Sequence, residues 1–307
     1  MRRVKIIFLT FLLAITLTKA FASAASPAKE IKLVFLGDVL AGGNLNYYYQ
    51  RYGYDYPWQK VKKYFQGKLV FANLESCISL RGKPEKKKYT FRGRPEFLKA
   101  MKKAGVTAVS VANNHSADYG LISLYDTLGY LRQEGIYYSG AGRDVYITEI
   151  PWQGYKIGFL AFSRVIPSTA WVASPKKTGV WSIYEPNVSK VLKLIHENDA
   201  KYDLLVVSVH WGVERDLTPN PPEIKLAHKL VEAGADVVMG HHPHVVQRYE
   251  IYKGRPIFYS LGNFIFTSNS NKETAKTVIV EAVFTGRKLK SVDVRYGEMK
   301  RGQPVIK

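Results

Sequence analysis

The stretch DVVMGHHPH at residues 236–244 joins a short apolar run to a cluster of histidines. Its apolar residues predict a buried β-strand over 236–239, which Gly240 follows. Three of the seven histidines of the chain fall within the next four residues. Imidazole is the commonest transition-metal ligand in proteins. In open α/β sheets, ligands bind at the carboxyl ends of the strands. This stretch therefore predicts such a sheet with a metal site at its edge.

Other apolar runs of the chain also end in residues that can bind a metal or a phosphate. The runs at 31–36, 69–72, 106–111 and 204–209 are followed by Asp38, by Asn73 and Glu75, by Asn113, Asn114 and His115, and by His210. Taken singly, each of these residues has an ordinary structural explanation. An Asp after a strand, for example, is often a helix N-cap. Because parallel strands end at one edge of a sheet, the whole set predicts a mixed oxygen and nitrogen metal centre.

Amphipathic segments separate these strands. The helix candidates are 58–65, 96–104, 121–133, 187–198 and 223–233. Strand and helix in alternation predict an α/β fold whose sheet is covered on both faces. Two apolar runs around residues 151–154 predict a β-hairpin, and several more strands are expected after residue 246. We see no repeat and no linker, so residues 25–307 are expected to form one domain.

The composition is that of a globular protein with a strong positive charge. The chain has 45 Lys and Arg against 25 Asp and Glu, a formal net charge of +20, and 46% hydrophobic residues. These values exclude a disordered chain, a collagen-like chain and a polytopic membrane protein. Cys77 is the single cysteine, so no intramolecular disulfide or zinc ribbon can form. The charge favours anionic partners, although many of the scattered lysines are explained by solvation of the surface.

The first 24 residues have the pattern of a signal peptide. Arg2, Arg3 and Lys5 precede an apolar stretch at 6–17 and an Ala-Ser-Ala cleavage pattern at 22–24. The apolar stretch is shorter than the roughly 20 residues of a membrane span, and an uncleaved signal anchor is the alternative. Cleavage removes four basic and no acidic residues, which leaves +16 of the formal +20. We expect an exported protein, secreted or membrane-associated, with an anionic cell-surface polymer rather than nucleic acid as its partner.

The order of the strand-end motifs resembles the CapA-type family of bacterial capsule and poly-γ-glutamate biosynthesis proteins (the PGA_cap domain). This family is related to the calcineurin-like metallophosphoesterases. The motifs that carry the resemblance are Gly37-Asp38, Asn73-Leu74-Glu75, Asn113-Asn114-His115, His210-Trp211-Gly212, the histidine cluster at 240–244 and Ser-Leu-Gly-Asn-Phe at 260–264. The resemblance runs from about residue 31 to residue 266. It implies a four-layer αββα metallophosphoesterase-like sandwich with metals at the strand carboxyl ends.

The resemblance also implies a role for each site residue. The ligands would be Asp38 and His244 for a first metal, Glu75 between two metals, and Asn114, His210 and His242 for a second. The cofactor would be one or two divalent ions of Mn, Fe or Zn. His115 would be the catalytic histidine, and His241 would support the site or the structure around it.

Two departures from the phosphoesterase pattern bear on activity. The usual Asp-x-His of the first strand is Asp38-Val39-Leu40 here, and Gly-Asp-x-x-Asp is replaced by Asn73-Leu74-Glu75. Two functions therefore stay open. One is a metal-dependent hydrolase in the synthesis, attachment or release of poly-γ-glutamate or capsule. The other is a non-catalytic component that binds the polymer or assembles with membrane synthase subunits.

A catalytic site of this kind would use metal, acid and cation together. A divalent metal makes water a nucleophile at neutral pH and stabilises the developing oxyanion. His115 would donate a proton to the leaving group. Arg92 would clamp a phosphate or carboxylate, or else form a structural ion pair. The tyrosine-rich segment at 47–58 would pack against the core or line a polymer groove.

Overall fold

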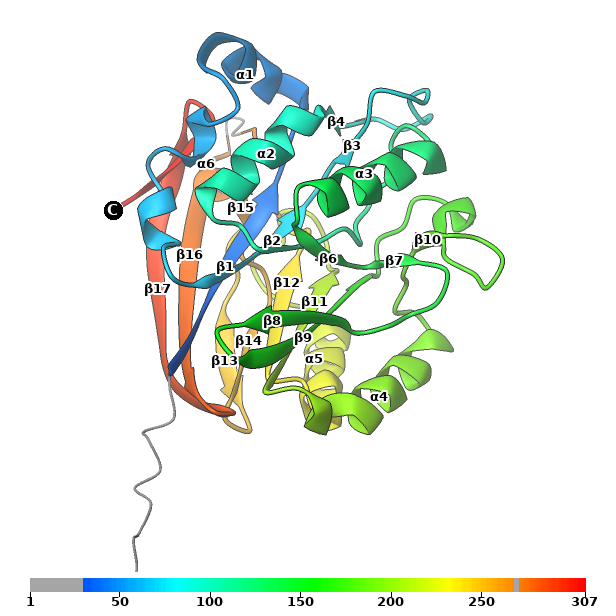
Figure 1. The fold of residues 1–307 in the computed structure, drawn as a ribbon, viewed down its shortest axis with the longest axis vertical. Helices are drawn as coiled ribbons and strands as arrows, with labels where there is room; N and C mark the ends of the chain where they lie inside the picture. Colours follow the sequence, from blue (N-terminus) through cyan, green and yellow to red (C-terminus); the bar gives the residue numbers. More distant parts are fainter. Residues whose placement is uncertain (1–29, 268–270) are drawn as a thin grey trace, which may run out of the picture.

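The computed structural model describes residues 30–267 and 271–307 of the chain. The predicted signal segment, residues 1–24, lies outside them. Two β-sheets stack face to face, and helices cover the outer face of each sheet (Figure 1). No helix in the described residues combines the length and the apolar character needed to span a membrane.

The first sheet has eight strands in the described residues, in the order β18-β17-β16-β1-β2-β5-β6, with β15 beside β1. Their bounds are Glu30–Val39 for β1, Leu69–Leu74 for β2, Ala108–Ser110 for β5, Tyr137–Ser139 for β6, Asn263–Ile265 for β15, Lys276–Thr285 for β16, Lys288–Lys300 for β17 and Gln303–Ile306 for β18. The neighbours β1, β2, β5 and β6 run parallel. Their carboxyl ends therefore meet at one edge.

The second sheet has six strands in the same residues, in the order β13-β14-β12-β11-β9-β8. The bounds are Thr148–Trp152 for β8, Tyr155–Ser163 for β9, Leu204–His210 for β11, Val237–His241 for β12, Tyr249–Tyr252 for β13 and Arg255–Phe258 for β14. The strands β9, β11, β12 and β14 are parallel. The predicted hairpin is confirmed as β8 and β9, which are joined at Gln153 and Gly154, both in the left-handed region.

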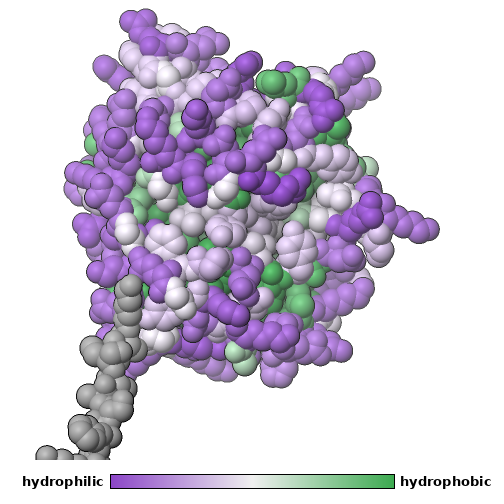
Figure 2. Space-filling view, in the orientation of Figure 1, coloured by the Kyte–Doolittle hydropathy of each residue, from purple (hydrophilic) through white to green (hydrophobic). Residues whose placement is uncertain are grey.

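Four of the five predicted helices are confirmed. Their bounds are Pro95–Ala104 for α2, Leu121–Gln133 for α3, Asn187–Asn198 for α4 and Pro221–Ala233 for α5. Helices α2 and α3 lie over the first sheet and α4 and α5 over the second (Figure 1). The surface over α2 and α3 is largely hydrophilic (Figure 2). The predicted helix at 58–65 was wrong, because Trp58 and Phe65 reach the core from 3₁₀ turns.

Short elements complete the described chain. They are η1 (Gly43–Leu45), α1 (Asn46–Tyr52), η2 (Tyr56–Trp58), η3 (Lys62–Tyr64), β3 (Cys77–Ile78), β4 (Arg92–Gly93), β7 (Ala141–Gly142), η4 (Thr169–Trp171), β10 (Gly179–Val180), η5 (Asp199–Lys201) and α6 (Lys272–Ala275). In the tyrosine-rich segment, Tyr48 stacks on Tyr56, whose hydroxyl donates to the carbonyl of Arg301. Much of that segment therefore packs against the C-terminal turn, whereas Tyr47 and Tyr52 stay exposed.

The main core lies between the two sheets. Phe71 of β2 meets Phe159 of β9 at 5.1 Å between ring centroids, and Phe35 of β1 meets Phe258 of β14 at 5.7 Å. The next residue of β9, Leu160, points the other way into a second cluster with α4 and α5. This period of two lets one strand bury both faces. The layers confirm the predicted αββα sandwich.

Candidate metal centre

The carboxyl ends of strands from both sheets place the predicted ligands together. Asp38 is the next-to-last residue of β1, and Glu75 directly follows β2. His210 ends β11 and pairs in register with His241 at the end of β12. The chain approaches itself closely here, since a side chain on Gly37 would lie 2.0 Å from the carbonyl oxygen of Gly262. Glycine is therefore required immediately before Asp38.

Two overlapping groups of side chains could each hold a metal ion. One is Glu75, His242 and His244, and the other is Asp38, Glu75 and His210, with the ligand atoms of each group within 4.8 Å of one another. Glu75 belongs to both groups, as a residue between two ions must. The pairing of the histidines differs from the one that the resemblance implies. Asn114 joins the set through its side-chain oxygen, 2.9 Å from His210 Nε2.

Asp38 is held from three sides. Its two carboxylate oxygens lie 3.1 Å from His241 Nδ1 and 3.3 Å from His244 Nδ1, and Asn73 donates a hydrogen bond of 2.9 Å to it. Burial opposes ionisation, but the two imidazoles beside the carboxylate hold the pKa of Asp38 well below its ordinary value. His241 is therefore a neighbour of Asp38 and lies outside both candidate ligand groups.

The pKa values of the other site residues reflect the burial of two carboxylates, Asp38 and Glu75, in one pocket. Burial and the charge of Asp38 raise the pKa of Glu75 well above its ordinary value. Burial disfavours a charged His244, but the charges of Glu75 and Asp38 outweigh it and raise the pKa of His244 to about 10. Burial and the charge of His244 lower the pKa of His242 to about 3. The shift of His244 shows that the two buried carboxylates favour a positive charge beside them, and the lowered pKa of His242 keeps that imidazole neutral, as a metal ligand must be.

Backbone strain and unpaired atoms mark the same residues. His242 and His244 have φ values of 98° and 57°, which are costly for residues other than glycine and recur at functional sites. Among the described residues, the buried atoms Glu75 Oε1 and His242 Nδ1 have no hydrogen-bond partner. Buried polar atoms normally have one. A divalent cation would satisfy both atoms, and carboxylate, amide and imidazole donors suit Mn, Fe or Zn.

His115 lies in a separate hydrogen-bonded group beside the ligands. Its Nδ1 is 2.7 Å from Asp118 Oδ2, and Asp118 is fully buried. Lys87 Nζ lies 2.6 Å from Asp118 Oδ1, and the backbone N–H of Phe91 donates to Asp118 Oδ2 at 2.6 Å. Burial lowers the pKa of His115, while the Asp118 carboxylate opposes that shift. Asp118 therefore fixes the imidazole ring and leaves Nε2 free for another partner.

Arg92 is engaged elsewhere. Its guanidinium lies 4.0 Å from the centroid of the Tyr119 ring and donates to the carbonyl of Arg81. It is not among the residues that line the cleft next to His115 and His244, where the cations are Lys88 and Arg215. The structure thus gives Arg92 structural partners, and its role in substrate binding stays a prediction.

Several residues that orient the site had no role assigned to them from the sequence. Asn113 donates to Asn73 at 3.0 Å and accepts from the backbone N–H of His115. Asn263 Oδ1 lies 2.9 Å from His244 Nδ1. These asparagines belong to the recognised strand-end motifs, so their position was a usable signal. Asp118 follows His115 by three residues, and this spacing was a weaker signal.

The chain is similar to a known protein family and to curated proteins of that family. Residues 32–268 match the family model described as "Bacterial capsule synthesis protein PGA_cap". The capsule biosynthesis protein CapA of Bacillus anthracis is 34% identical over 259 residues, 79% of this chain and 62% of that protein. The PGA biosynthesis protein CapA of Bacillus subtilis (strain 168) is 33% identical over 240 residues, 76% of this chain and 62% of that protein.

This chain thus spans less than two thirds of the length of these curated relatives. A hypothetical protein from Thermus thermophilus has a similar fold, with a TM-score of 0.54 at 17% identity, over 88% of this chain and all of that one. The family match covers most of the chain and all of the strand-end motifs. The chain therefore belongs to the PGA_cap family of bacterial capsule synthesis proteins.

Proposed function

We propose that this protein is an exported metal-dependent hydrolase that acts in the synthesis, attachment or release of poly-γ-glutamate or a similar anionic cell-surface polymer. The substrate class rests on the family and on the names of the relatives from the two Bacillus species. The observation that carries the chemistry is Glu75, a buried carboxylate shared by two candidate metal groups and left with an unpaired oxygen.

The metal would be held by strand-end donors in two overlapping sets. The residues are Asp38, Glu75, His210, His242 and His244, with Asn114 beside His210 and Asn73 supporting Asp38. When bound, divalent metal supplies an activated water and stabilises negative charge on the reacting group. The fixed strand ends hold the donors in place before a substrate arrives, so little reorganisation is needed.

His115 would be the general acid of the reaction. The Asp118 carboxylate holds Nδ1, so that Nε2 is the ring nitrogen available to a leaving group in the cleft. Burial lowers the pKa of His115, and the Asp118 carboxylate opposes that shift by favouring the protonated ring that can donate. Lys87 and the backbone of Phe91 keep Asp118 in place. Asp118 is therefore a positioning residue.

The second candidate is a non-catalytic component that binds polymer and assembles with membrane synthase subunits. One observation favours it. Leu40, two residues after Asp38, occupies the position of the usual phosphoesterase histidine and is fully buried in the core. One ligand of a first metal is thus replaced by a packing residue. A protein that kept the sandwich as a scaffold could retain the remaining donors for structure alone.

The decisive experiment measures metal content and turnover on the same sample. Purified protein would be analysed for Mn, Fe and Zn, and then screened on phosphoesters and on poly-γ-glutamate with each metal. Metal-dependent turnover that is lost in His115→Ala, with metal content retained, supports the hydrolase. Stoichiometric metal without turnover on any substrate would favour the assembly component.

A further inference from the structure

A cleft with a volume of about 480 Å³ opens beside the metal centre. His115 and His244 line it, so a molecule in the cleft reaches both the proposed acid and a proposed ligand. The remaining lining includes three aromatic residues, two cations and one carboxylate: Tyr89, Phe91, Phe266, Lys88, Arg215 and Glu214. No sequence motif indicates that Lys88 and Arg215, which are 127 positions apart, share a cleft.

One wall of the cleft is aromatic. Tyr89 stacks on Phe91 with 6.4 Å between ring centroids, and Phe91 meets Phe266 edge to face at 6.1 Å. Phe91 and Phe266 in turn lie 4.5 and 4.7 Å from the rings of His115 and His244. A continuous apolar surface therefore leads up to the metal centre. Such a surface suits the methylene groups of a substrate rather than its charges.

The two cations have no carboxylate partner in the described residues. Lys88 and Arg215 are exposed, whereas the neighbouring Lys87 is paired with Asp118. The backbone N–H of Arg215 donates to the carbonyl of Pro243 at 2.8 Å, which ties its loop to the histidine segment. Arg215 has a φ of 66°, so the loop holds a non-glycine residue in the left-handed region. Local strain of this kind recurs at ligand clamps.

Glu214 indicates which kind of anion the cleft can take. Its carboxylate lines the same cleft as His115 and His244, so it lies close to the metal centre. A ligand whose closely spaced charges lie along the backbone itself, such as polyphosphate, would place one of them next to Glu214 and be repelled there. A ligand whose carboxylates are separated by amides and methylenes can place a neutral part next to Glu214. It can then place a carboxylate next to Lys88 and Arg215.

We infer that Lys88 and Arg215 form a carboxylate-binding subsite that holds a side-chain carboxylate of a polyamide chain while a neighbouring bond lies at the metal centre. This inference rests on the proposed function for the identity of the polymer. Arg215 binds the carboxylate through two parallel N–H donors, and Lys88 adds a point charge. The aromatic wall packs the methylenes between successive carboxylates.

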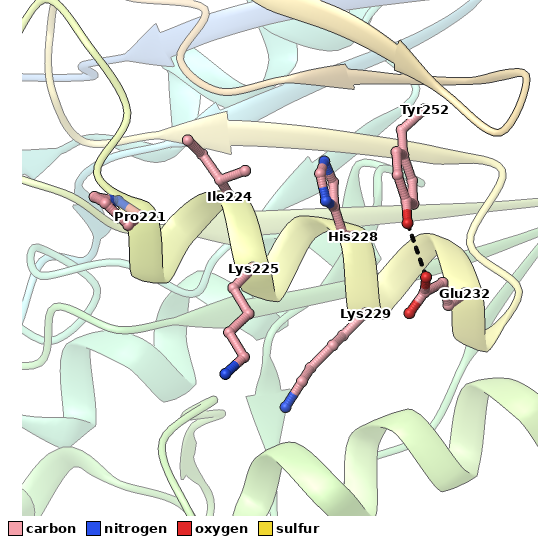
Figure 3. Close-up of a pocket in the computed structure, with 7 residues that line it drawn as sticks. All are labelled: Pro221, Ile224, Lys225, His228, Lys229, Glu232 and Tyr252. Carbon is pink, nitrogen blue, oxygen red and sulfur yellow. Dashed lines mark hydrogen bonds between the residues drawn. The ribbon is translucent and has the colours of Figure 1, made fainter.

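The test compares two double variants of equal charge. Lys88→Ala/Arg215→Ala removes the subsite, and Lys225→Ala/Lys229→Ala removes two cations from α5. The α5 lysines line a separate shallow pocket that shares no residue with the cleft. Figure 3 shows their side chains extended away from the hydrogen bond between Tyr252 and Glu232. Both variants lower the net charge by two, so long-range attraction falls equally in both.

Calorimetry would measure the binding of a γ-linked glutamate oligomer, its neutral γ-linked glutamine analogue and a polyphosphate of similar length. We expect the cleft variant to bind the glutamate oligomer at least about tenfold more weakly, the loss typical of charged hydrogen bonds. The α5 variant should bind it within about twofold of wild type, as surface charges contribute little. The glutamine oligomer should bind both variants as it binds wild type. Arg215→Lys should recover part of the loss.

The outcomes separate this inference from the proposed function. Equal weakening in both double variants, or no binding by wild type, would overturn the subsite. So would polyphosphate binding that is tighter than glutamate binding and is lost only in the cleft variant. Selective binding without turnover in any metal would support the subsite and contradict the hydrolase. Unchanged melting temperatures would show that both double variants are folded.

Discussion

Glu75 Oε1 lies 3.6 Å from His244 Nε2. This separation is too long for a hydrogen bond and close to the spacing of two ligands on one ion, whose bonds are about 2.0–2.2 Å each. His210 Nε2 stands 3.7 Å from the same oxygen. Glu75 is therefore flanked at similar distances by two imidazoles at the carboxyl ends of the second sheet: His210 ends β11, and His244 follows β12. This arrangement leads to specific expectations for metal binding.

His242→Ala should lower metal content strongly, because it removes an imidazole from one of the two donor groups. His241→Ala should have a smaller effect, since His241 contacts Asp38 and belongs to neither group. Loss of such a supporting contact typically weakens metal affinity by about 10–100-fold. Metal titration with elemental analysis would measure both. Excess metal should restore His241→Ala and leave His242→Ala depleted; equal content in both variants and wild type would defeat the assignment.

Asp118→Asn should slow turnover without removing metal. The amide keeps the size of the side chain but weakens its hold on His115 Nδ1 and its pairing with Lys87. His115→Ala should cost roughly 10²–10⁴-fold in kcat, the usual contribution of a general acid. Asp118→Asn should show part of that loss in kcat with KM little changed. A decrease in metal content parallel to the decrease in kcat would instead make Asp118 a structural residue of the ligand site.

Polymer binding should depend on salt in two separable parts. The formal net charge of +20, or +16 after the predicted cleavage, attracts a polyanion over a Debye length of about 8 Å at 0.15 M salt. Wild type should therefore bind poly-γ-glutamate more weakly as salt rises and keep a residual affinity at high salt. The double variant His242→Ala/His244→Ala should lose that residual affinity. Identical salt curves for the two proteins would show that the metal centre plays no part in recognition.

Asp236→Ala should destabilise the fold away from the site. Asp236 is fully buried, pairs with Arg255 and Arg287 at 2.9 Å, and accepts a hydrogen bond from the backbone of Leu205. Removing one partner of a buried charge network typically costs about 3–5 kcal/mol. Urea unfolding would measure the loss. As a control, Asp293→Ala breaks an exposed pair with Arg295 and should cost less than about 1 kcal/mol. Similar losses in both variants would contradict a special role for Asp236.

Local pattern in the sequence was sufficient for the alternation of strands and helices, whereas the αββα sandwich and the role of each site residue came from the resemblance to the CapA-type family. The short apolar runs of β11 and β12 are fully buried, and such runs predict buried strands from the local sequence alone. Parallel strands end at one edge, which is why the strand-end pattern alone predicts that Asp38, Glu75 and His242 lie together. The segment at 58–65 shows the limit of this reasoning. Its apolar residues reach the core from 3₁₀ turns, and their spacing resembles that of a helix.

Only the tertiary structure decided which charged residues face the site. Arg92 was predicted to clamp an anion or to form a structural ion pair. Its guanidinium instead lies over Tyr119, while Arg215 and Lys88, which no motif indicated, line the cleft. The sequence also did not predict that Asp118 contacts His115 or that His241 contacts Asp38. The physical reason is that strand and helix follow from local periodicity and burial. The direction and partners of a long polar side chain depend on loops that converge from distant parts of the chain.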